Sequence, residues 1–141
     1  MAKEGIYQTS NYFKKIDLFQ WGKFTSHAGL ELNWKIECDA ISEKEWDCLA
    51  SMIFQYEKRP FYKAIGIPRG GIPLANALNK FATGDKSHQT IICDDIWTTG
   101  TSFRDYIKEH YPNWLMAQGI KWVVFARKMT NDGTNALFTM P

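Results

Sequence analysis

The sequence predicts an α/β domain with a small parallel sheet that is flanked by helices. Three short runs are apolar throughout, at 64–67, 90–93 and 122–126, and a turn with a helical pattern follows the first two. Strands that are apolar on both faces belong in a parallel sheet covered by helices on each side. In such folds ligands bind at the carboxyl ends of the strands, so we expect binding residues in the turns after Ile67 and Cys93.

The segment before these runs has a different pattern. Polar and apolar residues alternate from Glu31 to Asp39, which predicts a strand with one face in water. Ser42 and Glu45 form a capping box, and apolar residues recur at helical spacing after it. A helix is therefore expected from about Ser42 to Glu57. Further helices are expected over 72–81 and 102–110, and a short edge strand over 136–140.

Composition limits the classes of function. A chain of 141 residues, 45% of them apolar, is one domain that buries a core without disulfide or metal support. The 17 Lys and Arg residues are interspersed with 15 Asp and Glu residues, which argues against a nucleic-acid partner. No apolar run approaches the roughly 20 residues that span a bilayer, so no membrane partner is expected. Three cysteines at unrelated spacings favour a reducing cytoplasm over a disulfide framework or a zinc site.

The segment after the 90–93 strand combines two chemistries. Asp94 and Asp95 are adjacent carboxylates, which accept hydrogen bonds from vicinal hydroxyls or bind Mg²⁺ through oxygen. The next residues offer hydroxyls and backbone amides at the start of a helix, which suits an anion; they are Thr98, Thr99, Gly100, Thr101 and Ser102. A phosphorylated sugar fits both halves. The alternative is that the aspartates begin an ordinary turn and that Thr101 or Ser102 caps the helix.

The run from Ile91 to Ser102 resembles the phosphoribosyl pyrophosphate signature of the type I phosphoribosyltransferases. In that signature an apolar strand leads to two acidic residues, an apolar pair and a T-T-G-[GT]-[ST] turn. The resemblance implies that Asp94 and Asp95 contact the ribose 2′ and 3′ hydroxyls. It also implies that they hold Mg²⁺, directly or through water and those hydroxyls, and that Thr98 to Ser102 surround the 5′-phosphate.

A glycine turn follows the first apolar strand. Glycines at 70 and 71 let backbone amides approach an anion closely, and Arg69 offers bidentate hydrogen bonds to phosphate oxygens. By itself this sequence is only a turn. Its position resembles the family's pyrophosphate loop, which often contains an unusual cis peptide bond. The resemblance implies that Arg69, Gly70 and Gly71 hold the leaving diphosphate.

The third resemblance concerns the base. The segment from Trp21 to Gly29 is similar to the F-T-L-K-S-G segment of orotate phosphoribosyltransferases, with Ser26, His27 and Ala28 in place of Leu, Lys and Ser. That segment helps form a hood over the base, so we expect one domain over 1–141, with a core of about 42–127 and a hood formed mainly by 1–41 and 128–141. A flat heterocycle stacks on aromatic rings. The expected base-pocket residues are Phe24, His27, Ile96, Trp97 and Phe138.

The resemblance implies a Mg²⁺-dependent pentosyltransferase that acts on phosphoribosyl pyrophosphate and a nitrogenous base and releases pyrophosphate. Asp94, Asp95 and Arg69 would be its catalytic residues. Thr98 stands where hypoxanthine and guanine enzymes carry an aspartate, which favours an orotate-like pyrimidine over a 6-oxopurine. The family is usually dimeric, so a homodimer is expected.

Two other functions stay open. The family has a long mobile loop that closes over the sugar and excludes water, and this chain has only residues 83–89 at that place. The short segment favours a non-catalytic module that senses a nucleotide or phosphoribosyl pyrophosphate. A plain α/β interaction domain would require the acidic and glycine turns to be coincidental.

Overall fold

The computed structural model describes residues 17–25, 29, 31–113 and 119–140. The chain divides into two compact units, with the boundary between Ser42 and Glu43. In the first unit, β1 (Phe19–Thr25) and β2 (Glu31–Ile36) form an antiparallel pair, followed by the 3-10 helix η1 (Cys38–Ala40). The strand predicted over 31–39 ends at Ile36, because the Glu37 carboxylate accepts a hydrogen bond from the Asp39 amide (3.4 Å) and caps η1.

The second unit is a four-stranded sheet with helices on both faces. Its strands lie in the order β3-β4-β5-β6 and are parallel throughout. The elements in chain order are α2 (Glu43–Tyr56), β3 (Phe61–Gly66), α3 (Ile72–Leu78), η2 (Asn79–Phe81), β4 (Gln89–Trp97), α4 (Thr101–His110), β5 (Ile120–Ala126) and β6 (Asn135–Thr139). The predicted fold class, a small parallel sheet flanked by helices, is confirmed.

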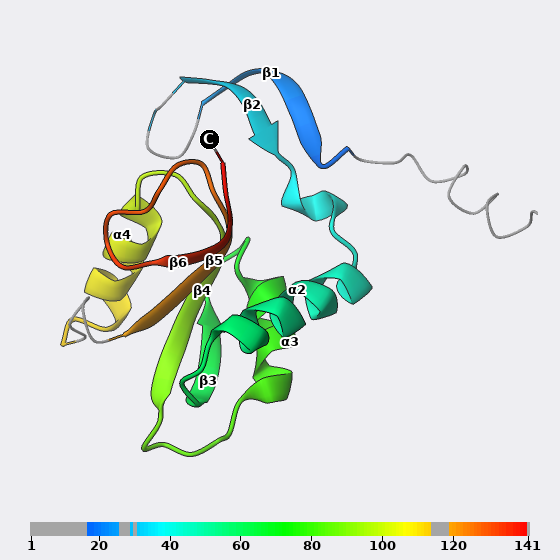
Figure 1. Ribbon diagram of the computed structural model, residues 1–141. Helices are drawn as coiled ribbons and strands as arrows, with labels where there is room; N and C mark the ends of the chain where they lie inside the picture. Colours follow the sequence, from blue (N-terminus) through cyan, green and yellow to red (C-terminus); the bar gives the residue numbers. More distant parts are fainter. Residues whose placement is uncertain (1–16, 26–28, 30, 114–118, 141) are drawn as a thin grey trace, which may run out of the picture. The chain divides into compact units, whose positions relative to one another are not determined.

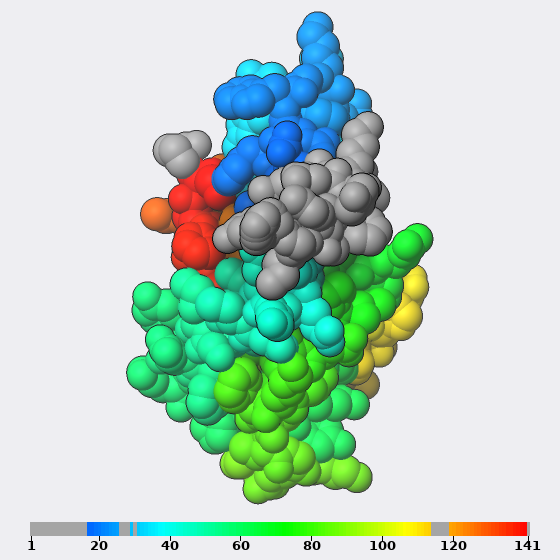
Figure 2. Space-filling model, turned by 90° about the vertical axis from the view of Figure 1, so that its right-hand side faces the viewer, coloured from blue at the N-terminus to red at the C-terminus, as the bar shows by residue number. Residues whose placement is uncertain are grey.

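The two faces of the sheet are covered by different helices (Figure 1). On one face α4 packs Phe103 and Ile107 against Ile92 of β4 and Val123 of β5. On the other face lie α2 and α3, whose side chains form much of the surface in Figure 2. Every residue of β5 is buried, as expected for a central strand covered on both sides.

Two strands differ from the sequence prediction in ways that affect the site. β4 continues beyond Cys93 to Trp97, because Asp94 pairs with Val123 and Trp97 with Ala126 in parallel register. Residues 135–139, within the stretch that we assigned to the hood, form β6 and add a fourth strand beside β5. The predicted edge strand is thus present, and it belongs to the core sheet.

Buried tryptophans support the core on both sides. Trp46 and Trp122 are buried, whereas Trp34 is half-buried. The indole N–H of Trp122 donates to Glu57 Oε1 (2.9 Å), and the same carboxylate accepts hydrogen bonds from the backbone and side chain of Arg59. No helix among the described residues is long and apolar enough to cross a membrane.

Candidate phosphate and sugar site

The acidic pair lies within the carboxyl-terminal half of β4, next to the middle of the sheet. Asp94 Oδ1 accepts a hydrogen bond from the Asp95 amide (2.8 Å), and Asp95 Oδ1 accepts one from the Ile96 amide (2.7 Å). These two backbone hydrogen bonds use one oxygen of each side chain, and a side-chain hydrogen bond also links Asp94 to Asp95. The aspartates do not begin an ordinary turn, because the strand pairing with β5 continues past both of them.

Burial gives Asp94 an unusual protonation state. The residue is only 7% exposed, and burial followed by the neighbouring charge of Asp95 raises the pKa of Asp94 to about 9. In the ligand-free protein the raised pKa favours the protonated form of Asp94, and a bound cation would favour the ionised form. A carboxylic acid beside a carboxylate offers a donor and acceptors, which is a suitable set for a pair of sugar hydroxyls.

The glycine turn after β3 closes onto the end of β4. The Ile67 amide donates to Cys93 O (2.9 Å), and the Gly71 amide donates back to Ile67 O (2.9 Å). A Cβ on Gly71 would lie 2.5 Å from Cys93 O, and one on Gly70 would lie 2.8 Å from Asp95 Cγ. Position 71 therefore requires glycine, because its neighbours are backbone atoms, and at Gly70 the turn lies directly against the Asp95 carboxylate.

This contact brings the two predicted anion-binding and sugar-binding segments to one place. The peptide bond between Pro68 and Arg69 is cis, the feature expected at this loop. The Arg69 side chain is exposed and forms no ion pair with any residue that the structure describes. Its guanidinium is therefore available to a phosphate beside Asp95.

The hydroxyl-rich turn connects β4 to α4. Gly100 has φ +84° and is the N-cap of α4, with no side-chain cap, so neither Thr101 nor Ser102 caps the helix as the alternative required. The Thr99 and Thr101 hydroxyls are hydrogen-bonded at 2.8 Å. Arg104, one turn later, donates to Thr101 Oγ1 (3.1 Å). The Thr101 amide also donates to Thr99 Oγ1 (3.4 Å). The start of α4 thus combines backbone amides, hydroxyls and a cation, which together suit a phosphate.

Sequence reasoning did not identify Arg104, although its spacing of three residues from Thr101 on a predicted helix was a usable signal. It also did not identify Asp132, which lies far along the chain. Asp132 Oδ2 would be 2.8 Å from a Cβ on Gly100, so the carboxylate packs against this turn.

The base-pocket prediction is wrong for Trp97. Its side chain is 1% exposed and packs against Phe103 and Ile107, and its indole N–H donates to Asp132 Oδ2 (3.1 Å). The ring is in the core because β4 extends to this residue and turns it toward α4. No ring face is left for a heterocycle.

The other predicted base-pocket residues lie in different parts of the chain. Ile96 pairs with Phe125, and Phe125 pairs with Phe138, so the three form a row across β4, β5 and β6. The Phe125 and Phe138 rings are stacked with centroids 5.7 Å apart, and Phe138 is 39% exposed. Phe24 belongs to the first unit, where Lys35 Nζ lies 4.8 Å from its ring. His27 lies outside the described residues.

The short segment before β4 is at the opposite end of the strand from the acidic pair (Figure 1). His88 Nδ1 lies 2.7 Å from Thr83 Oγ1, and the Ser87 amide donates to Asp85 Oδ1 (2.9 Å), so the segment folds on itself. From Gln89 to Asp94 the strand rises about 17 Å at 3.3 Å per residue. This segment cannot cover the site.

The carboxylates are compatible with a hard cation that retains other ligands. Among the described residues no group of three or more His, Cys, Asp or Glu side chains could hold a metal ion. Carboxylate oxygens such as those of Asp94 and Asp95 are the donors that Mg²⁺ prefers, and Mg²⁺ is commonly bound through one or two carboxylates plus waters and substrate phosphates. The donor set therefore fits Mg²⁺ only together with a phosphorylated ligand.

No protein-family model and no curated protein sequence matches the chain. Several solved structures share its fold. An orotate phosphoribosyltransferase from Aeropyrum pernix has a TM-score of 0.62 at 17% identity, over 86% of this chain and 88% of that one. UMP synthase from Leishmania donovani has a TM-score of 0.63 at 16% identity, over 86% of this chain and 33% of that one. The orotate phosphoribosyltransferase of Francisella tularensis has a TM-score of 0.57 at 14% identity, over 86% and 80%. The chain has the type I phosphoribosyltransferase fold.

Proposed function

We propose that the protein is a Mg²⁺-dependent phosphoribosyltransferase, which moves phosphoribosyl from phosphoribosyl pyrophosphate to a nitrogenous base and releases pyrophosphate. One observation carries the proposal: Gly70 of the glycine turn lies directly against Asp95 of the acidic pair, and the hydroxyl-rich turn follows three residues after that pair. Diphosphate, ribose and 5′-phosphate follow one another in the donor molecule, and the three segments provide matching chemistry in one region.

Each segment has a role in this reaction. Asp94 and Asp95 bind the two ribose hydroxyls, and their negative potential stabilises the positive charge that develops on the ring as the C1–oxygen bond breaks. The amides and hydroxyls of Thr98 to Ser102 bind the 5′-phosphate, and Arg69 binds the departing diphosphate. A bound Mg²⁺, held through Asp94 and Asp95, would supply further neutralisation of that diphosphate. Catalysis then consists mainly of positioning and electrostatic stabilisation.

The acceptor in this proposal is an orotate-like pyrimidine. Thr98 supplies no carboxylate for the base proton, and the row of Ile96, Phe125 and Phe138 offers an apolar surface with an exposed ring at its edge. A cytoplasmic homodimer completes the proposal. A partner subunit would then exclude water from the reacting carbon.

A second candidate is a non-catalytic module that binds a nucleotide or phosphoribosyl pyrophosphate. The observation that favours it is the position of residues 82–88. They precede β4, whose first residue lies about 17 Å along the strand from Asp94, so they form no lid over the acidic pair. The glycine turn favours the enzyme, because a sensor that binds only a nucleoside monophosphate has no diphosphate for Arg69 to bind.

Calorimetry with phosphoribosyl pyrophosphate and Mg²⁺ tests the proposal. We expect the wild type to bind and the double variant Asp94→Asn/Asp95→Asn to lose at least tenfold in affinity. The matched control is Asp105→Asn, an exposed aspartate on α4 that should leave binding unchanged. Absence of binding by the wild type, or undiminished binding by the double variant, refutes the site. Pyrophosphate release with orotate and with a panel of other bases then separates the enzyme from the sensor.

A further inference from the structure

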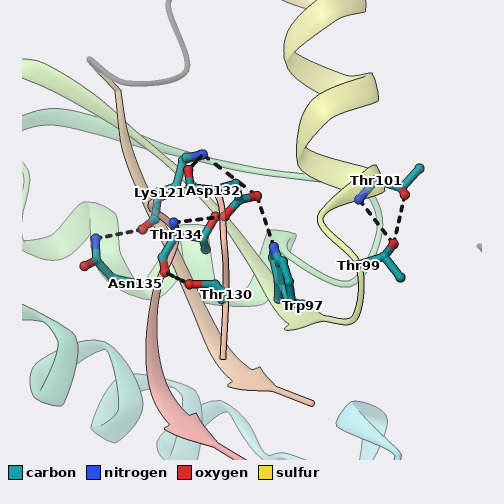
Figure 3. Close-up of polar contacts among 8 residues, drawn as sticks. All are labelled: Trp97, Thr99, Thr101, Lys121, Thr130, Asp132, Thr134 and Asn135. Carbon is teal, nitrogen blue, oxygen red and sulfur yellow. Dashed lines mark hydrogen bonds and ion pairs between the residues drawn. The ribbon is translucent and has the colours of Figure 1, made fainter. Parts of the chain in front are cut away.

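A largely buried polar bridge between Trp97, Asp132 and Lys121 lies beside the hydroxyl-rich turn (Figure 3). Asp132 comes from the loop between β5 and β6, 35 residues after Trp97. Its Oδ2 accepts the indole N–H of Trp97 (3.1 Å), and its Oδ1 accepts the Thr134 amide (3.0 Å). Its backbone oxygen accepts a hydrogen bond from Lys121 Nζ (2.6 Å). The loop is therefore tied to both central strands.

The bridge touches the turn at Gly100. A Cβ added there would lie 2.8 Å from Asp132 Oδ2 and 3.0 Å from Trp97 Nε1, so the glycine backbone packs directly on this hydrogen bond. Gly100 also has the φ of +84° that starts α4. The direction of the amides and hydroxyls on either side of Gly100 therefore depends on where the carboxylate and the indole are held.

Charge compensation holds the carboxylate in this place. Burial acts to raise the pKa of Asp132, but hydrogen bonds from Thr134 and Trp97 and the charge of Lys121 outweigh it and lower that pKa. Lys121 is almost fully buried in β5, with Nζ 4.0 Å from Asp132 Oδ2. A carboxylate next to an anion-binding turn would repel a bound phosphate. The positive charge of Lys121 and the Trp97 indole N–H offset the negative charge of Asp132.

We propose that Asp132 is a positioning residue for the sugar-phosphate turn, acting through the Trp97 indole and Gly100, with Lys121 holding Asp132 from the sheet side. The identity of the ligand in this inference rests on the proposed function. The glycine turn around Arg69 is attached to β4 through Cys93 and not through this bridge. Loss of the bridge should therefore weaken the binding of the 5′-phosphate and spare the binding of pyrophosphate.

Two variants interrupt the bridge in different ways. Asp132→Asn leaves one acceptor oxygen for two donors, and Trp97→Phe removes only the indole N–H and part of the ring, which keeps most of the packing. Trp122→Phe is the matched control, since it removes an equally buried indole-to-carboxylate hydrogen bond on Glu57. Asp105→Asn is the control for the charge change.

Two measurements are made on each protein. Hydrogen exchange of the amides from Thr98 to Ser102, without ligand, reports the order of the turn. Calorimetry with ribose 5-phosphate and, separately, with pyrophosphate and Mg²⁺ reports the two halves of the site. We expect Asp132→Asn and Trp97→Phe to speed exchange in the turn and to weaken ribose 5-phosphate about tenfold, with pyrophosphate affinity within twofold of the wild type. Trp122→Phe should lower stability without either change.

The inference is overturned if both bridge variants have the exchange rates and the ribose 5-phosphate affinity of the wild type. Equal losses of both ligands, which indicate general unfolding, also overturn it. If the wild type binds neither ligand, the proposed function fails, and exchange without ligand decides the positioning role alone. Faster exchange in the turn of both bridge variants then supports that role, and unchanged exchange overturns it.

Discussion

Asp94 should make the protein less stable as pH rises. Its pKa is about 9 in the folded chain, against an ordinary value of 3.8 in an unfolded one, because the side chain is buried beside Asp95. At pH values between these two pKa values, Asp94 binds a proton in the folded state and has lost it in the unfolded state. The free energy of unfolding therefore falls with increasing pH, by at most about 1.4 kcal/mol per pH unit from this residue. From pH 5 to pH 8 the fall is at most about 4 kcal/mol.

The variant Asp94→Asn removes this dependence. Its amide resembles the protonated carboxyl in shape and still has an oxygen to accept the Asp95 amide, but it does not ionise. We therefore compare the free energies of unfolding of the variant and the wild type. The difference, variant minus wild type, should increase by about 2–4 kcal/mol between pH 5 and pH 8. This is a large part of the 5–15 kcal/mol that is typical of a folded domain.

Urea unfolding at pH 5, 6.5 and 8, followed by tryptophan fluorescence in the presence of EDTA, measures that difference. Histidines and other titrating groups away from Asp94 and Asp95 contribute equally to both proteins, so they cancel. Asp105→Asn, on the exposed face of α4, should give a difference from the wild type that stays constant with pH. If the curves of wild type and Asp94→Asn run parallel from pH 5 to pH 8, Asp94 is ionised in the folded protein and the burial argument is wrong.

Three further substitutions test other parts of the structure by urea unfolding. Gly71→Ala would place a Cβ 2.5 Å from the buried Cys93 carbonyl, so we expect a loss of about 3 kcal/mol or an insoluble protein. Glu57→Ala leaves the Trp122 indole N–H unpaired and should cost about 2 kcal/mol at pH 7. Hydrogen bonds lower the pKa of Glu57 despite its burial, so this difference should shrink as pH falls below 4.5. Lys80→Ala breaks an exposed ion pair and should change stability by less than about 1 kcal/mol at any salt concentration.

Local sequence patterns predicted most elements of the fold but not β1 or η1. The all-apolar runs predicted three of the four parallel strands, and the tail was predicted as an edge strand. The expected helices are present with boundaries shifted by a residue or two, except that the predicted 72–81 helix divides into α3 and η2. These features follow from periodicity and capping, which involve residues close in the chain.

Local pattern also indicated which segments of the second unit meet. Parallel strands place their carboxyl ends at one edge of the sheet, so the turns after Ile67 and Cys93 could be expected near each other. The structure places Gly70 against Asp95. Topology was enough for this expectation, because the strands carrying the two turns are neighbours in the sheet.

The surroundings of single side chains were decided only by the tertiary structure. Trp97 looked available to a ligand, since it interrupts a polar motif, but the length of β4 and the packing of α4 bury it. Sequence analysis did not single out Asp132, which contacts Gly100 from 32 residues away because β6 returns the chain beside β5. Periodicity and turn chemistry depend on near neighbours in the chain. Burial and long-range hydrogen bonds depend on which distant segments the folded chain brings together.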